Sequence, residues 1–95
     1  MRAADMLTAL TIDVYRENFT GIYYMSNSQL VPYTGIFINT NNELILYREK
    51  NKPPLSMKEL FTNLLENRTL PLRSMNGSDL LEVYGLRIEN RKIIL

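Results

Sequence analysis

The sequence of 95 residues contains no cysteine, no histidine and no tryptophan. Without cysteine the chain has no disulfide and no thiolate nucleophile, and without histidine it has no side chain that ordinarily titrates near neutral pH. Zinc sites built from these residues and Cys–His or Ser–His catalytic machinery are therefore excluded. Only four glycines occur, each isolated, which excludes a glycine-rich phosphate-binding loop.

Neither sign of charge predominates. The chain has eleven Lys and Arg residues and ten Asp and Glu residues, a net charge of +1. A charged partner must therefore bind a local charged patch, because the net charge of the whole molecule is too small to attract it. Apolar runs are short, and Leu44–Tyr47 ends at Arg48, well below the roughly 18 residues of a membrane span. Met1–Val14 is interrupted by acidic residues and does not resemble a signal peptide. A cysteine-free chain of this kind predicts a cytoplasmic protein with no membrane contact.

The length and mass of 11.1 kDa fit a single small globular domain over residues 1–95. The composition, 45% hydrophobic and 22% charged, is that of an ordinary folded chain. It is also rich in Asn, Ile, Lys and Tyr, a bias that AT-rich coding produces and that is common in small phage or mobile-element proteins.

An internal sequence repeat is the clearest feature of the chain. Residues 20–33 and 34–47 lie end to end and coincide at six of fourteen positions, and residues 85–95 repeat the same plan. Duplication of a segment, or coincidence among residues common in strands, explains this internal repeat equally well. Each copy predicts two strands around a polar tip, and the first two copies place strands near 20–25, 29–33, 34–39 and 43–48.

Glycine and proline mark the ends of these strands. Gly21, Gly35 and Gly85 head the three copies and predict a bulge or a left-handed residue there. Pro32 predicts an edge strand, a bend or a corner between two strands, because it lacks the N–H that a central strand needs. The charged segment Arg48–Pro54 ends in a proline pair and closes this part of the sheet.

One helix is strongly indicated over 56–67. Ser56-x-x-Glu59 is a capping box, and apolar residues follow at helical spacing, namely Met57, Leu60, Phe61, Leu64 and Leu65. A second helix is predicted over 3–16, although Leu10, Ile12 and Val14 also alternate as in a strand. Asn76-Gly77 predicts a turn. Ser78 can cap a helical turn through Leu81, or Leu81–Leu86 can already be a strand, and we favour one helical turn followed by a strand.

The predicted fold is α+β, with an antiparallel β-meander of about five or six strands and one or two helices packed on it. Catalytic patterns are lacking. Ser56 and Lys58 miss the Ser-x-x-Lys spacing, and Asn39–Glu43 lacks the carboxylates of a calcium loop. We therefore expect a protein that is not an enzyme and has no catalytic residue, metal or cofactor.

Apolar residues at consecutive positions, Tyr23–Met25 and Leu44–Tyr47, supply both faces of the sheet. The second face is covered by the N-terminal helix, by a second copy or by another protein. The leading hypothesis is a non-enzymatic protein-binding or assembly module, a homodimer or a regulator or inhibitor of another protein. Its expected contact residues are Tyr23, Tyr24, Tyr33, Phe37, Tyr47, Arg48, Lys50 and Lys52.

The alternative function is nucleic-acid binding by a sheet surface. Arg87, Arg91 and Lys92 supply cations on the last predicted hairpin, and the aromatic residues of the sheet supply rings for bases to stack on. Interspersed glutamates dilute each basic group, and no RNP-like motif is present.

Overall fold

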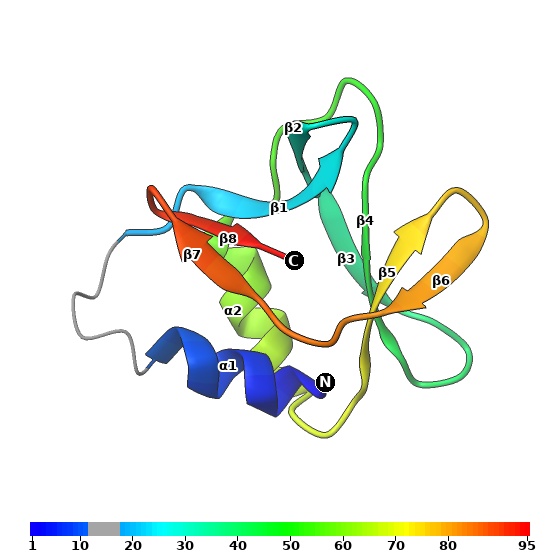
Figure 1. Cartoon of the computed structure of the whole chain (residues 1–95). Helices are drawn as coiled ribbons and strands as arrows, with labels where there is room; N and C mark the ends of the chain where they lie inside the picture. The colour runs from blue at the N-terminus through cyan, green and yellow to red at the C-terminus, as the bar shows by residue number, and fades with distance from the viewer. Residues whose placement is uncertain (12–17) are drawn as a thin grey trace.

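The structure is a computed structural model, and it describes residues 1–11 and 18–95 (Figure 1). Among these residues the order of elements is α1 (Ala3–Thr11), β1 (Gly21–Ser26), β2 (Gln29–Pro32), β3 (Gly35–Ile38), β4 (Leu44–Tyr47), α2 (Met57–Glu66), β5 (Leu72–Asn76), β6 (Asp79–Glu82), β7 (Arg87–Glu89) and β8 (Lys92–Ile94). The α+β class is confirmed. The four strands predicted between residues 20 and 48 are confirmed within one residue at each end.

The strands form two mixed sheets, so the prediction of a single antiparallel meander is wrong. Sheet 1 has the order β2-β1-β8-β7, and sheet 2 has the order β3-β4-β5-β6. Each sheet consists of two antiparallel hairpins whose inner strands run parallel, β1 beside β8 and β4 beside β5. α2 provides the crossover from β4 to β5 that a parallel pair requires. β1 and β8 instead come from opposite ends of the chain.

Three hairpins close through two-residue turns. Asn27–Ser28 and Asn90–Arg91 have positive φ at both positions, the pattern of type I′ turns. In the β5–β6 hairpin Gly77 has φ +64°, the pattern of a type II′ turn. The turn predicted at Asn76-Gly77 is therefore confirmed within a residue. The helical turn predicted at Ser78–Leu81 is wrong, because pairing of β6 with β5 outweighs the local capping signal of Ser78.

α2 begins where its capping residue predicts. The Ser56 hydroxyl accepts a hydrogen bond from the Glu59 N–H at 3.1 Å, and Leu60 and Leu64 are completely buried on the inner face. The helix predicted over 3–16 is confirmed for Ala3–Thr11, and residues 12–16 lie outside the described part of the chain.

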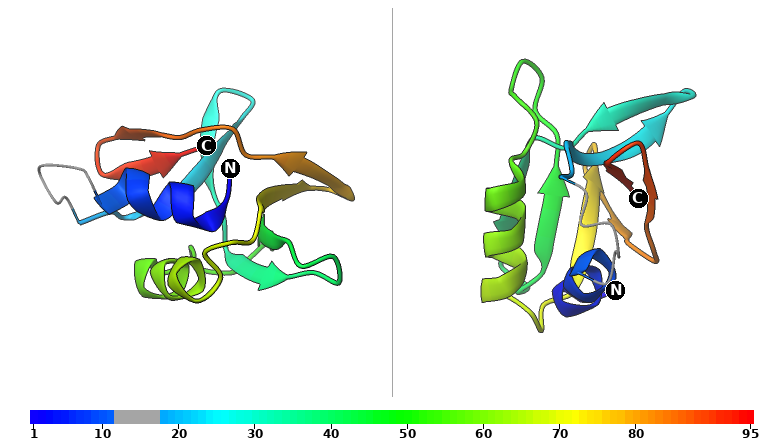
Figure 2. Two further views of the ribbon diagram at one scale, coloured as in Figure 1. Left: turned by 90° about the horizontal axis from the view of Figure 1, so that it is seen from below. Right: turned by 90° about the vertical axis from the view of Figure 1, so that its left-hand side faces the viewer.

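The core lies between the two sheets and the helices. Figure 2 shows sheet 1 and α2 on opposite sides of the molecule, with α1 packed against α2 along one border and sheet 2 closing the other. Leu44, Ile45 and Leu46 are consecutive in β4 and each is 0% exposed. The chain therefore covers both faces of this strand by itself, so the apolar run at 44–46 requires no partner.

Gly21 and Gly35, the first glycines of the first two copies of the internal repeat, lie beneath tyrosine rings. The ring of Tyr23 packs on Gly21, and a Cβ at Gly35 would collide with the ring of Tyr47. Neither glycine has a positive φ, and neither does Gly85, so the prediction of a left-handed residue at these positions is wrong. At Gly21 and Gly35 the missing Cβ serves close packing instead.

Candidate functional site

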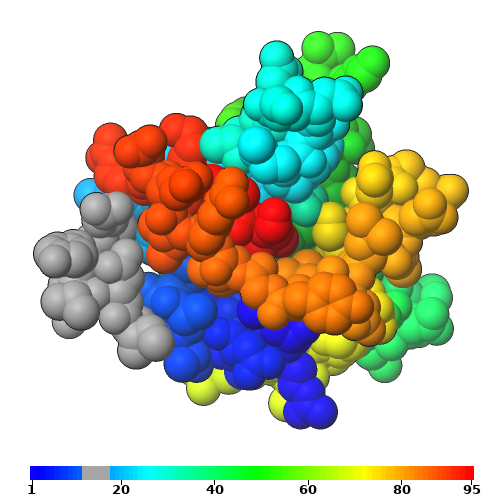
Figure 3. Space-filling model, in the orientation of Figure 1, coloured from blue at the N-terminus to red at the C-terminus, as the bar shows by residue number. Residues whose placement is uncertain are grey.

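A groove of about 380 Å³ lies between the β1–β2 and β5–β6 hairpins. In Figure 3 it lies between the cyan and the yellow-orange hairpins, with the red end of the chain at its base. Its apolar walls include Met25 from β1, Leu81 from β6, Val83 and Tyr84 from the link that follows β6, and Leu95. The groove is therefore built from parts of both sheets that are far apart in the sequence.

Tyr33 forms the floor of this groove. It is 2% exposed, and its ring lies 5.0 Å from the ring of Tyr24 at an angle of 47°. The Tyr33 and Ser74 hydroxyl groups are hydrogen-bonded, with their oxygen atoms 2.5 Å apart. Burial raises the pKa of Tyr33, so its phenol stays neutral. The groove thus presents one uncharged hydroxyl pair beneath apolar walls.

Large apolar side chains are exposed around the groove. Tyr84 is 85% exposed, and Met25 and Leu81 are each 49% exposed. Leu80, beside Leu81 on the opposite face of β6, is 40% exposed. Such clustering of exposed apolar residues at a groove is typical of binding surfaces.

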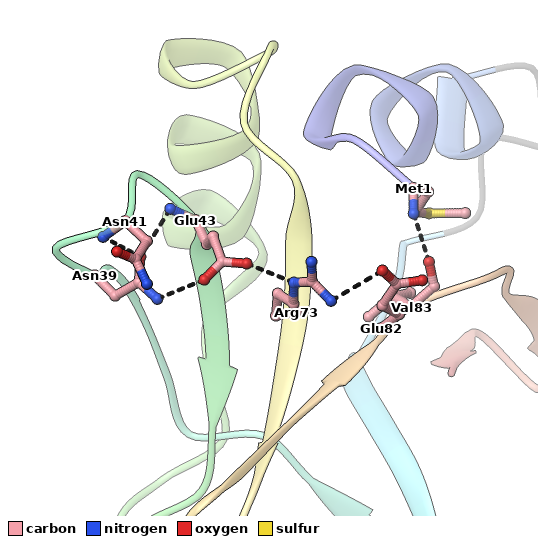
Figure 4. A network of polar contacts seen from close by, with 7 residues as sticks. All are labelled: Met1, Asn39, Asn41, Glu43, Arg73, Glu82 and Val83. Atoms are coloured by element: carbon pink, nitrogen blue, oxygen red, sulfur yellow. Dashed lines mark hydrogen bonds and ion pairs between the residues drawn. The ribbon is translucent and has the colours of Figure 1, made fainter.

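The link that carries Tyr84 is anchored by the residue before it. Val83 is 4% exposed, and its carbonyl accepts a hydrogen bond from the Met1 nitrogen at 2.6 Å (Figure 4). Because Val83 is held in the core, Tyr84 points away from it into solvent.

A polar network lies on the outer face of sheet 2, the face opposite the core residues Leu44 and Leu46 (Figure 4). The Arg73 Nε donates to the Glu43 carboxylate at 2.6 Å, and Arg73 Nη1 lies 3.0 Å from the Glu82 carboxylate. Hydrogen bonds from the Asn39 amide and from Arg73 lower the pKa of Glu43, and the bond to Glu43 raises the pKa of Arg73. The carboxylates of Glu43, just before β4, and of Glu82 in β6 thus share the guanidinium of Arg73 in β5.

The aromatic residues expected at a contact surface occupy three separate places. Tyr24 and Tyr33 belong to the groove. Phe37 and Tyr47 form an edge-to-face pair on the outer face of sheet 2, with ring centroids 5.5 Å apart. Tyr23 lies on the outer face of sheet 1. These five side chains do not form one surface.

The basic residues are divided in the same way. Arg48 donates from its guanidinium to the Pro32 carbonyl at 3.3 Å, whereas Lys50 and Lys52 are exposed in the connection that follows β4. In the last hairpin the Lys92 ammonium lies 5.8 Å from the ring centroid of Tyr23. The two other cations of that hairpin, Arg87 and Arg91, are exposed.

Sequence reasoning missed the residues of β6 and the link after it. Leu80, Leu81 and Tyr84 lie there, in a segment that was expected to begin with a helical turn. The Asn76-Gly77 turn between two short runs of mixed apolar and polar residues was the available signal of a hairpin.

Within residues 1–11 and 18–95, no group of three or more acidic side chains is placed to hold a metal ion. No helix in that part of the chain is long and apolar enough to cross a membrane. No family model, curated protein or solved structure matches this chain. The geometry of the groove and its surroundings is therefore the basis for a functional proposal.

Proposed function

We propose that this chain is a non-enzymatic protein-binding module that takes an extended segment of another protein along β6, with side chains of that segment in the groove. The observation that carries this proposal is the position of β6. It is one of the two edge strands of sheet 2, all four of its residues are exposed, and it borders an apolar groove.

The backbone of β6 offers free hydrogen-bonding groups. A two-residue hairpin closes with a hydrogen-bonded pair of residues, here Asn76 and Asp79. Hydrogen-bonded and non-bonded pairs alternate along antiparallel strands, so the N–H and C=O groups of Leu80 and Glu82 face away from β5. An added strand pairs with groups of this kind.

The other sheet edges are less suited to this role. β2 ends at Pro32, which has no N–H, and its carbonyl is occupied by Arg48. β7 has three residues. β3 exposes Phe37 and Ile38, but no residue of β3 lines the groove. A hollow of about 550 Å³ between α1 and α2 is apolar as well, but it adjoins no strand edge.

Side chains of an added strand alternate between its two faces, so every second one would point toward the groove. There it would contact Leu81, Tyr84 and Met25. Aromatic and aliphatic anchors in such pockets supply most of the energy in protein interfaces. The neutral hydroxyl pair of Tyr33 and Ser74 lies at the floor, where it can bond one polar atom of the bound segment.

Charge indicates the chemistry of the partner. Asp79, Glu82 and Glu43 place three carboxylates on and beside the β5–β6 hairpin, and Arg73 is the cation among them. A bound segment that alternates apolar residues with Lys or Arg complements this excess. A second copy paired through its own β6 would bring the same carboxylates, so we favour a basic segment of a different protein over a twofold dimer.

A display library of random peptides about ten residues long tests this proposal, with the whole chain as the immobilised target. We expect the enriched peptides to alternate apolar and basic residues and to lose binding when Leu81→Ser is introduced. Leu65→Ser is the matched control, because Leu65 is 48% exposed on α2 and Leu81 is 49% exposed on β6. Both variants should unfold at the same urea concentration as the parent chain.

Three outcomes would overturn the proposal. The first is enrichment of peptides that bind the Leu65→Ser chain less well than the Leu81→Ser chain. The second is a selection that yields no binder at micromolar concentration. The third is a chain that is dimeric through β6 at the concentrations used, which would assign the edge to a second copy.

A further inference from the structure

The outer face of sheet 1 carries a row of neighbouring residues that crosses all four strands. Arg87 on β7 lies beside Ile94 on β8, which lies beside Tyr23 on β1 and then Pro32 on β2. Arg48 extends this row, because its guanidinium is bonded to the Pro32 carbonyl. With strands about 4.8 Å apart, the four strand positions span roughly 14 Å. Arg87 lies at one end, the Tyr23 ring lies between, and Arg48 lies beyond the other end.

Two further cations lie beside this ring. Lys92 is the partner of Gly21 in the parallel ladder, and its ammonium is 5.8 Å from the Tyr23 ring centroid. The absence of a side chain at Gly21 lets the Tyr23 ring pack against the backbone there. Arg91 is exposed at the tip of the β7–β8 turn, where its φ is +63°. Lys92 thus lies over one partly buried aromatic ring, and Arg48, Arg87 and Arg91 lie on neighbouring strands and turns.

Negative charge on this face is small. In the four strands of sheet 1 the one carboxylate is Glu89, which lies 3.5 Å from Arg87. Both side chains of this pair are more than half exposed, so the pair is screened by water and salt and exchanges readily with other charges. Phosphate groups can therefore compete with Glu89 for Arg87.

We propose that the outer face of sheet 1 binds single-stranded nucleic acid. A base stacks on Tyr23 after the flexible Lys92 side chain moves aside, and the backbone phosphates contact Arg48, Arg87, Arg91 and Lys92. Single-stranded binding surfaces combine these two elements, because stacking tolerates any base and cations follow the backbone. This site is distinct from β6, so it goes beyond the proposed protein-binding function and does not depend on it.

Fluorescence anisotropy of a labelled oligouridine of about 12 nucleotides tests this proposal at several salt concentrations. Each phosphate neutralised contributes about 0.7 to the slope of log affinity against log salt. We expect the triple variant Arg87→Gln, Arg91→Gln, Lys92→Gln to lower this slope by about 2. Lys58→Gln with Arg68→Gln, on and just after α2, is the control and should leave the slope unchanged.

The ring is tested separately from the charges. Tyr23→Leu should weaken oligouridine binding about tenfold without changing the salt slope, and Tyr23→Phe should bind as the parent does. Heparin and duplex DNA are the competing probes. Equal binding of heparin and oligouridine with no effect of Tyr23→Leu would mean that the face attracts any polyanion, which would overturn the proposal. Preference for the duplex, or no binding at low salt, would overturn it too.

Discussion

The substitution Leu80→Pro tests whether the backbone of β6 binds a partner strand, independently of the β6 side chains. The Leu80 N–H faces away from β5, so a proline there removes no bond of the β5–β6 hairpin. We expect the free energy of unfolding to change by less than about 1 kcal/mol. The substitution does remove a donor that an added strand needs, and it leaves an acceptor of that strand without a partner.

The size of the binding effect follows from this unpaired acceptor. A buried group left without its hydrogen bond costs about 1–3 kcal/mol, which corresponds to roughly 5-fold to 150-fold weaker binding. Leu80→Ala is the matched control, because it removes the side chain but keeps the N–H, and it should weaken binding by less than about 5-fold. The assay is anisotropy of a library-selected peptide, with urea unfolding of each variant. Equal affinities for Leu80→Pro and Leu80→Ala would refute strand addition at β6.

Three further predictions concern two ionisable residues, Glu43 and Tyr33, and the packing at Gly35. The lowered pKa of Glu43 means that its contact with Arg73 stabilises the fold fully above about pH 4.3 and less as pH falls through the lowered pKa, so the urea midpoints of the parent and of Glu43→Gln should approach each other as pH falls below about 4.3. The raised pKa of Tyr33 means that the parent should lose stability as pH rises above about 10, a loss that Tyr33→Phe should reduce in a urea titration across that range. Gly35→Ala should cost about 1–3 kcal/mol in urea unfolding because of the ring above it, whereas Gly85→Ala, with no atom within 4 Å of its added Cβ, should stay within about 0.5 kcal/mol.

The elements that could be predicted are those fixed by residues close together in the sequence. Ser56 and Glu59 lie one helical turn apart, and they fix the start of α2. Asn27–Ser28 and Asn90–Arg91 tolerate the left-handed conformation that tight hairpin turns demand. These local signals depend on no distant contact, and the structure contains each of them.

The pairing of hairpins could not be predicted in the same way. β1 lies beside β8 rather than beside β3. The internal repeat had instead indicated that β1–β2 and β3–β4 are successive hairpins of one meander. Equivalent positions of the repeat occupy different places in the fold, because Gly21 lies in a central strand of sheet 1 and Gly35 in an edge strand of sheet 2. Which hairpins pair is decided by burial of side chains from both ends of the chain, for example Ile22 against Ile93.

The groove could not be predicted from the sequence either, because distant segments of the chain form it. Tyr24, Ser74, Tyr84 and Leu95 come together through the fold, and no spacing in the sequence connects them. Of the aromatic residues that line it, Tyr24 and Tyr33 were recognised and Tyr84 was not, and Tyr33 was expected at a surface but is buried. Its burial follows from its position at the corner where the chain passes from sheet 1 to sheet 2.

Amide hydrogen exchange, read by NMR on the whole chain with and without a library-selected peptide, tests most directly whether β6 receives a partner strand. We expect the Leu80 and Glu82 amides to exchange more slowly in the complex, while the amides of β2 and β7 stay unchanged. Unchanged exchange at Leu80 and Glu82 when the peptide is bound, or new protection at another edge, would contradict the proposal.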